Sequence, residues 1–519
     1  MTSRILLRGG LVADGIATTV RRADLLVTGQ TVARITPGIE PGPDAEVIDL
    51  APGALVCPGF VDAHTHAEWP LLTTGRVDGA LAQGVTTLVT GQDGQSWIGA
   101  NARTAGYLNQ YFAPVNGSLS ASASPAGGLS VAGFHDAVRG RLTQNVAVLA
   151  SQGTIRHNVA ALARVPLDAD QRAAARREVE QALTDGAAGL SSGLDYLPSR
   201  HGTVDEVAAL ARPLAAADRP YVSHLRSYGS GVASGLAELI AVGRLAGVRV
   251  HASHLWGATA GIRDSFRTAT RLDVPLTFDM YPYRKSSTIL AMLLLPPEAQ
   301  ADGPAATLAA LRDPAQRHAL LAGERLADAY LDQVYLGCLP GGDAALAGLT
   351  VAGAARRAGR PPGEWALDLL AGADLNVGGH LDRPTLSGAG LAWLLDHPRF
   401  SAGSDGIYQG QHPHPRGYGT FARLAAHYLA AGPEAGGQRL ARHLATNAAD
   451  AYGLSGRGRL APGQAADVCV LAPGGLADRA TYAAPDRLAG GVTLVLVNGT
   501  VVWRDGQPVT TAHPGQLVS

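Results

Sequence analysis

The chain has 519 residues, a formal net charge of −1 at pH 7 and a charged fraction of 16%. This length allows one large α/β domain and a smaller one. The balanced charge, without a Lys/Arg run, argues against binding to nucleic acid or to acidic membranes. The cysteines, Cys57, Cys338 and Cys469, form no Cys-x-x-Cys pair, which argues against a disulfide scaffold and favours a cytoplasmic protein. The longest apolar stretch, 288–296, is far too short to span a bilayer.

Both ends of the chain are predicted to form short antiparallel strands. The first 56 residues hold alternating apolar runs separated by turn residues, at 5–7, 24–28, 32–35 and 47–50. The tail holds further runs, at 468–471, 492–497 and 501–503, with a hairpin signal at Asn498-Gly499. Neither end has enough strands for an independent fold. We therefore predict that residues 1–56 and 457–519 together form one small β-sandwich domain.

Residues 57–456 alternate strand-like runs with helical stretches rich in Ala, Leu and Arg, which is typical of a TIM-type (β/α)8 barrel. The eight strand candidates lie at 59–66, 85–90, 146–151, 187–192, 220–224, 248–254, 275–280 and 400–404. In such barrels the chemistry takes place at the C-terminal ends of the strands. Residues 284–375, between the seventh and eighth strands, are too many for a plain crossover. They predict a helical insertion that covers the site.

Two histidines end the first of these strands, His64 and His66 in Pro58-Gly59-Phe60-Val61-Asp62-Ala63-His64-Thr65-His66. Side chains alternate faces along a strand, so the two imidazoles are expected to point the same way and to bind one metal ion. A His-x-His pair alone is weak evidence, because about half of such pairs are ordinary polar or core residues. Further ligands are needed.

Four more candidate ligands follow strand ends: Asp93 in Gly91-Gln92-Asp93-Gly94, His224, His254, and Asp405 in Ser404-Asp405-Gly406. A single Asp after a strand is more often a helix cap, but six such groups at one barrel rim indicate a metal site. Imidazole and carboxylate suit one or two zinc ions, with manganese or iron as alternatives. A metal-bound water supplies hydroxide near neutral pH. Asp405 is the candidate to take a proton from this water and deliver it to a leaving nitrogen.

The chain also resembles the amidohydrolase superfamily and, within it, the N-acyl-D-amino-acid deacylases, or D-aminoacylases, over nearly its whole length. The resemblance rests on the segments 58–66, 84–87, 189–194, 279–283, 404–406, 414–421, 478–482, 497–499 and 502–504. It implies a zinc-containing barrel, a flanking β-domain and hydrolysis of the amide bond in N-acyl-D-amino acids, small-molecule substrates. It also implies that His64, His66, His224 and His254 are metal ligands, and that Asp405 is the general base and a weak-site ligand.

The resemblance also suggests which residues contact the substrate. It implies that Tyr281, Ser287 and Arg416 hold the substrate carboxylate, a role that suits a fixed guanidinium. The alternative for Arg416 is a surface ion pair. The remaining candidates for the substrate pocket are Tyr196, Arg226, Trp256 and Tyr283.

Three positions depart from the deacylase pattern. Asp93 stands where the deacylases usually have a metal-bridging cysteine, and the only lysine, Lys285, follows the seventh strand and cannot provide the carboxylated lysine of other amidohydrolases. Asp93 is therefore the predicted bridge. Trp256 replaces a lysine that helps to hold the substrate carboxylate, and Tyr228 replaces an acidic residue. These two changes predict a more aromatic pocket for a bulkier or less anionic substrate, and Lys285 is expected to be a solvated loop residue.

Two other functions stay open on the sequence alone. One is hydrolysis of a cyclic or other acyl amide, as in hydantoinase-like and dihydroorotase-like enzymes. The other is a binding or assembly protein built on an inactive barrel, which predicts that ligands are missing; the presence of all six candidates argues against it. The sequence does not indicate an oligomeric state.

Overall fold

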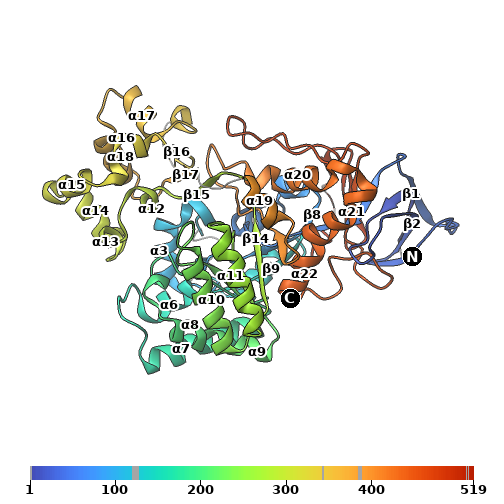
Figure 1. Cartoon of the computed structure of the whole chain (residues 1–519), viewed down its shortest axis with the longest axis horizontal. Helices are drawn as coiled ribbons and strands as arrows, with labels where there is room; N and C mark the ends of the chain where they lie inside the picture. Colours follow the sequence, from blue (N-terminus) through green and yellow to red (C-terminus); the bar gives the residue numbers. More distant parts are fainter. Residues whose placement is uncertain are drawn as a thin grey trace.

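The computed structural model describes residues 3–119, 128–339, 341, 344–383, 388–509, 511 and 513–519. Figure 1 shows three parts along the longest axis of the molecule. A sheet that includes β1 (Arg4–Val12) and β2 (Arg21–Thr28) lies at one end, and an insertion that runs from α12 (Leu290–Leu294) to α18 (Pro362–Gly372) lies at the other. Between them lies the central part, where helices surround parallel strands.

The sheet at the first end combines strands from both ends of the chain. Its order is β23-β22-β21-β20-β5-β1-β2-β3, with β4 paired to β1. Besides β1 and β2 it contains β3 (Thr31–Thr36), β4 (Ala45–Asp49), β5 (Leu55–Pro58), β20 (Val468–Leu471), β21 (Val492–Val497), β22 (Thr500–Arg504) and β23 (Gln507–Pro508). The two chain ends meet where β5 pairs with β20. Apolar side chains that alternate along these strands, among them Leu7, Leu25 and Leu496, pack in one buried cluster.

Two groups of parallel strands form the central part. β6 (Phe60–Asp62), β8 (Val85–Thr90) and β9 (Asn145–Val148) form the first group. The second contains β10 (Ala150–Ser151), β11 (Leu190–Gly193), β12 (Tyr221–His224), β13 (Val250–Ala252), β14 (Leu276–Met280) and β18 (Phe400–Ala402), in that order. Only Leu149 separates β9 from β10, and the Ala63 N–H donates to the Ala402 carbonyl at 3.0 Å. Each of the eight predicted strands overlaps at least one of these parallel strands, and 146–151 overlaps both β9 and β10. Most of their residues are buried, as expected for strands covered on both faces.

The first predicted strand, 59–66, is interrupted. β6 ends at Asp62, and β7 (Thr65–His66) pairs instead with β19 (Gly406–Ile407). The cause is the Asp62 carboxylate, whose Oδ1 accepts hydrogen bonds from the backbone N–H groups of His64 at 3.3 Å and Ser404 at 2.8 Å. The two histidines therefore do not lie on one continuous strand as predicted, although both imidazoles belong to the same group of candidate ligands, as predicted. The chain turns at His64 before it reaches His66.

Helices surround the parallel strands of the central part. They are α1 (Glu68–Thr74), α2 (Asp78–Leu81), α3 (Ala102–Tyr111), α4 (Ala113–Asn116), α5 (Val131–Val138), α6 (Gln152–Ala160), α7 (Ala169–Thr184), α8 (Val204–Ala211), α9 (Pro213–Ala216), α10 (Val232–Ala246), α11 (Thr259–Arg271), α19 (Gly388–Leu395), α20 (Arg416–Tyr428), α21 (Pro433–Ala441) and α22 (Asn447–Tyr452). Local sequence explains several ends. Asp168 and Gln171, for example, form a capping box at the start of α7.

The insertion combines helices with a small sheet. Its helices are α12, α13 (Pro297–Gln300), α14 (Pro304–Arg312), α15 (Pro314–Leu321), α16 (Asp328–Leu331), α17 (Val351–Arg357) and α18. The sheet has the order β15-β17-β16 and consists of β15 (Lys285–Ile289), β16 (Val334–Leu336) and β17 (Gly378–Asp382). The sequence predicts only helices for this insertion. β17 lies beyond the predicted boundary at residue 375. It returns the chain to the central part.

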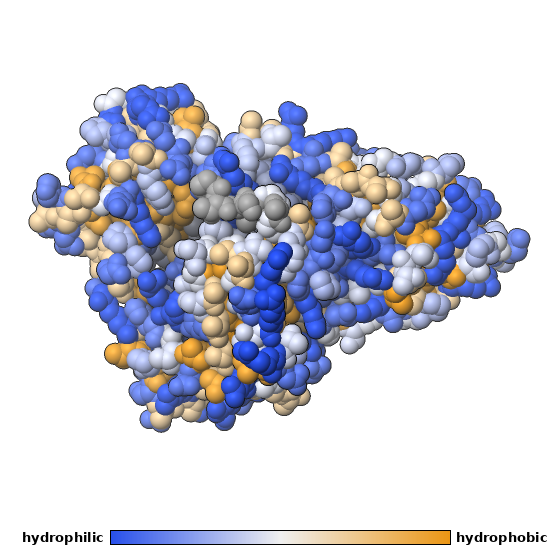
Figure 2. All heavy atoms as spheres, in the orientation of Figure 1, coloured by the Kyte–Doolittle hydropathy of each residue, from blue (hydrophilic) through white to orange (hydrophobic). Residues whose placement is uncertain are grey.

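A helix that spans a membrane must be both long and apolar. Across the described ranges, every helix is too short or too polar to cross a bilayer. On the face drawn in Figure 2, hydrophilic residues cover much of the surface and hydrophobic residues form separate patches.

A buried polar network joins the terminal sheet to β9, and it predicts a large effect on stability. Asp467 pairs with Arg457 and accepts hydrogen bonds from the Asn145 side chain at 3.0 Å and from the Asn498 backbone N–H at 2.8 Å. We expect Asp467→Ala to lower the free energy of unfolding by about 3 kcal/mol, because it leaves the Arg457 charge buried and unpaired. Urea denaturation measures the change. Asp450→Ala, which removes an exposed pair with Arg459, is the control and should have little effect.

Candidate metal centre and substrate pocket

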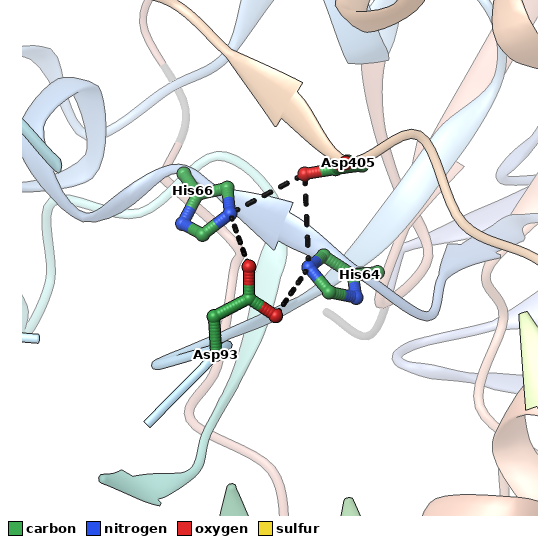
Figure 3. A group of neighbouring side chains, drawn as sticks. All are labelled: His64, His66, Asp93 and Asp405. Atoms are coloured by element: carbon green, nitrogen blue, oxygen red, sulfur yellow. Dashed lines mark ion pairs between the residues drawn. The ribbon is translucent and has the colours of Figure 1, made fainter. Parts of the chain in front are cut away.

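Six polar side chains from separate strand ends meet in the central part. They form two overlapping groups that share one carboxylate: His64, His66, Asp93 and Asp405 in the first, and Asp93, His224 and His254 in the second. Within each group the nitrogen and oxygen atoms lie within 4.8 Å of one another. Figure 3 shows the first group, in which the two imidazoles and the two carboxylates point toward a common centre. All six predicted ligands are thus brought together.

Asp93 faces all four imidazoles. Its Oδ1 lies 3.5 Å from His64 Nε2 and 3.6 Å from His254 Nε2, and its Oδ2 lies 3.6 Å from His66 Nε2 and 3.7 Å from His224 Nδ1. These distances are too long for good hydrogen bonds. Ligand atoms about 2.1 Å from one tetrahedral zinc ion lie roughly 3.4 Å apart. The spacing therefore fits side chains arranged around a cation.

Unusual backbone conformations aim three of these side chains. Asp93, His254 and Asp405 have positive φ angles of 58°, 33° and 49°, in a region that non-glycine residues rarely adopt. Gly94, next to Asp93, also has a positive φ, and a Cβ there would lie 2.7 Å from the Ser192 Cα. The chain therefore turns sharply at these strand ends. These turns direct the side chains into one space.

A further carboxylate, Asp279, lies behind the histidines. Its Oδ2 is 3.5 Å from His64 Nδ1 and 3.0 Å from His251 Nε2, and its Oδ1 accepts the His254 N–H at 2.9 Å. Burial raises the pKa of Asp279, but the charges and hydrogen bonds of His64 and His251 outweigh burial and lower it. His251 is in neither ligand group. Asp279 is not among the predicted site residues, although it lies near the end of β14, as the ligands lie at or just after strand ends.

The electrostatics of the site hold Asp405 in its charged form. Arg416 Nη1 lies 2.6 Å from Asp405 Oδ2, and the Arg416 side chain is fully buried, which excludes the surface ion pair that was the alternative. Burial alone raises the pKa of Asp405, but Arg416 and His66 lower it below its usual value. Burial also lowers the pKa of His254, which favours a neutral ring. A neutral imidazole is the form that binds metals.

Several atoms of the site lack a hydrogen-bond partner. Both ring nitrogens of His64 and the Oδ1 of Asp93 are buried without one among the described residues. Leaving buried polar atoms unpaired is costly unless something else satisfies them. The donor set of imidazole nitrogens and carboxylate oxygens therefore fits a divalent cation.

A cavity of about 230 Å³ opens beside these six side chains. Five of the predicted substrate residues line it: Tyr196, Trp256, Tyr281, Ser287 and Arg416. Tyr228 also lines it and stacks on Trp256, with the rings 1° from parallel and their centroids 6.1 Å apart. The more aromatic wall predicted from these two residues is therefore present.

Two predicted substrate residues do not reach this cavity. Tyr283 lies behind it, with its hydroxyl 3.3 Å from Asp478 and the Arg423 guanidinium 3.9 Å from its ring. Arg226 pairs with Glu238 at 2.9 Å and donates to backbone carbonyls. Both side chains support the surrounding loops instead of lining the pocket.

Two cationic side chains, Arg383 and Lys285, differ from what the sequence predicts. Arg383, just after β17, lines the cavity, and nothing in its sequence neighbourhood marks it. Lys285 is not a solvated loop lysine, because its Nζ lies over the rings of Tyr335 and Tyr482, 3.2 and 4.3 Å from their centroids. These rings do not lie in the cavity lining. Lys285 therefore does not supply the charge that Trp256 lacks.

Comparison with known proteins agrees with this geometry. The sequence pattern described as "Amidohydrolase family" matches residues 46–503. A D-aminoacylase of Alcaligenes xylosoxydans xylosoxydans is 30% identical over 99% of this chain and 97% of its own length. The crystal structure of N-acyl-D-glutamate deacylase from Bordetella bronchiseptica, complexed with zinc and a phosphonate inhibitor, matches with a TM-score of 0.81 and 26% identity over 99% of both chains. D-hydantoinase from Thermus sp. has a TM-score of 0.55 and 16% identity over 99% of this chain and 98% of its own, a likeness of fold alone.

Proposed function

Because the chain belongs to the amidohydrolase family, we propose that it is a metal-dependent hydrolase of the linear amide bond in N-acyl-D-amino acids. The observation that carries this proposal is the pair of overlapping ligand groups that share Asp93 beside a cavity of about 230 Å³. Similarity over nearly the whole length to D-aminoacylases supports the linear amide. D-hydantoinase, at 16% identity, shares the fold alone and therefore gives no support to a cyclic amide as the substrate.

In this proposal zinc is the cation, held by His64, His66, Asp93, His224, His254 and Asp405, with Asp93 shared between the two groups. When bound, zinc supplies an acidic water and polarises the carbonyl of the amide. Asp405 moves the proton. Its Oδ2 is held by Arg416, while its Oδ1 lies among the imidazoles, 3.4 Å from His66 Nε2. The Oδ1 atom is therefore placed to accept a proton from water and to deliver it to the leaving nitrogen.

The proposal includes the domain arrangement. Residues 57–456 form a closed (β/α)8 barrel, residues 1–56 with 457–519 form a β-sandwich, and residues 284–375 form most of a lid over the pocket. Hydrogen bonds between the last and first strands support closure, since the Asp405 N–H donates to the His64 carbonyl at 2.8 Å. Ser287, Thr288 and Met292 support the lid, because residues 284–375 place all three in the cavity lining.

A substrate panel tests the proposal. The zinc-loaded protein is assayed with N-acetyl-D- and N-acetyl-L-amino acids and with hydantoins. We expect turnover of the N-acetyl-D-amino acids with release of free amino acid. Turnover of the ring compounds alone would overturn the proposal, and turnover of none of them would favour the binding protein.

Zinc binding should depend on pH. In the metal-free protein, burial lowers the pKa of His66, but Asp405 and Asp93 outweigh burial and raise it to about 10. His66 must release this proton to bind a cation. We expect zinc affinity to increase as the pH rises from 7 toward about 10, and zinc binding at pH 7 to release a proton. Calorimetry in two buffers with different heats of ionisation measures this release, and a heat that is the same in both buffers would contradict it.

A further inference from the structure

The cavity beside the metal centre contains a buried cation, Arg383, whose hydrogen-bond partners among the described residues are neutral groups. Arg383 is 8% exposed. Its Nη2 donates to the Tyr281 hydroxyl at 3.0 Å and to the Tyr283 carbonyl at 3.3 Å, and its Nε donates to the Arg284 carbonyl at 3.1 Å. Within the described ranges of the chain, no carboxylate pairs with it.

The carboxylates near Arg383 are already engaged. Of the three that line the cavity, Asp93 faces the four imidazoles, Asp405 pairs with Arg416 at 2.6 Å, and Asp195 pairs with Arg200 at 3.1 Å. Asp382, which precedes Arg383, pairs with Arg284, the residue just before β15. A buried charge without a counter-charge costs several kcal/mol. An anionic ligand in the cavity would remove that cost.

Two aromatic rings fix the Arg383 guanidinium. Its Cζ lies 4.8 Å from the Trp256 ring centroid and 5.3 Å from that of Tyr281. Trp256 in turn is parallel to Tyr228, whose ring centroid is 5.2 Å from that of His254. A guanidinium stacked in this way keeps a fixed set of N–H donors that matches a carboxylate. The stack also connects this cation to the metal centre.

We propose that Arg383 binds a carboxylate of the substrate and that Trp256 is the aromatic support that positions it. The inference rests on the proposed function, in which the substrate is an N-acyl amino acid. The carboxylate comes either from the α-carboxylate or from the side chain of an acidic amino acid. The pocket thus keeps a cation for an anionic substrate even though position 256 is not a lysine, contrary to the expectation of a less anionic substrate.

The test compares Arg383→Gln and Arg383→Lys with the wild-type protein on three substrates: N-acetyl-D-leucine, N-acetyl-D-glutamate and N-acetyl-3-methylbutylamine, which lacks a carboxylate. We expect Arg383→Gln to lower kcat/KM about 100-fold through KM on the carboxylate substrates, the loss typical of a buried charge pair. The amine derivative should be unaffected, and Arg383→Lys should recover part of the loss. Loss on both acids identifies the α-carboxylate, and loss on N-acetyl-D-glutamate alone identifies the side chain.

Arg267→Gln is the matched control, because Arg267 pairs only with Asp264 on the exposed side of α11, and its kinetics should equal those of the wild type. An equal loss on all three substrates in both Arg383 variants, or no loss, would overturn the role of Arg383. Circular dichroism and the content of bound metal show whether each variant is folded. If Arg383→Gln is not folded, the comparison of Arg383→Lys with the wild-type protein provides the test. If the wild-type protein hydrolyses none of the three, the proposed function itself fails, and the role of Arg383 with it.

Discussion

Replacing Asp405 with Asn should reduce kcat on an N-acetyl-D-amino acid by about 10³-fold, within the range that general acid–base catalysis contributes. Asn keeps the shape of the side chain but cannot accept the proton from water. It also removes the partner of the buried Arg416, whose Nη1 lies 2.6 Å from the carboxylate. We expect most of the bound metal to remain, because the four histidines and Asp93 are unchanged. Steady-state kinetics and metal analysis of the same sample measure both effects.

The control for this variant is Asp396→Asn. Asp396 is also paired with an arginine, Arg439, but on the exposed surface, so its loss should leave kcat unchanged. An Asp405→Asn protein with full metal and a wild-type rate would show that another group moves the proton.

Replacing Asp93 with Ala should disrupt both halves of the metal centre. Each carboxylate oxygen of Asp93 faces two imidazoles, at 3.5 to 3.7 Å, and no other residue belongs to both ligand groups. We expect metal affinity to decrease about 100-fold or more and activity at limiting zinc to decrease with it. Metal content after dialysis against zinc buffers measures the affinity.

Asp93→Cys is the informative companion. A thiolate also binds zinc, so this variant should retain metal that Asp93→Ala loses. If Asp93→Ala keeps its metal and its rate, the shared role of Asp93 is wrong. If both variants lose metal to the same degree, the site requires an oxygen ligand at this position.

The ligand set could be read from the sequence because each candidate follows a strand-like run. His224 ends β12, and His254 and Asp405 closely follow β13 and β18, which belong to the same parallel sheet. Parallel strands bring their C-terminal ends to the same edge. The same rule applies to Asp279, the second-last residue of β14. The sequence does not mark it as a site residue, because a carboxylate near a strand end does not by itself reveal whether it faces the metal or supports a ligand.

The pocket was harder to predict, because it depends on contacts between distant segments. Arg383 reaches the cavity because β17 pairs with β15, about 90 residues earlier in the chain, and such pairing leaves no local pattern. Tyr283 and Tyr281 are two residues apart, yet only Tyr281 lines the cavity. Proximity in a motif therefore does not fix which side of the loop a side chain occupies.

Titration of the metal-free protein with zinc tests the central claim most directly. The protein is stripped with a chelator, and hydrolysis of an N-acetyl-D-amino acid is followed as zinc is returned. We expect no turnover without metal and a rate that rises with bound zinc until binding is saturated. A full rate in protein shown by analysis to contain no metal would contradict the claim that these six side chains hold the ion that activates water.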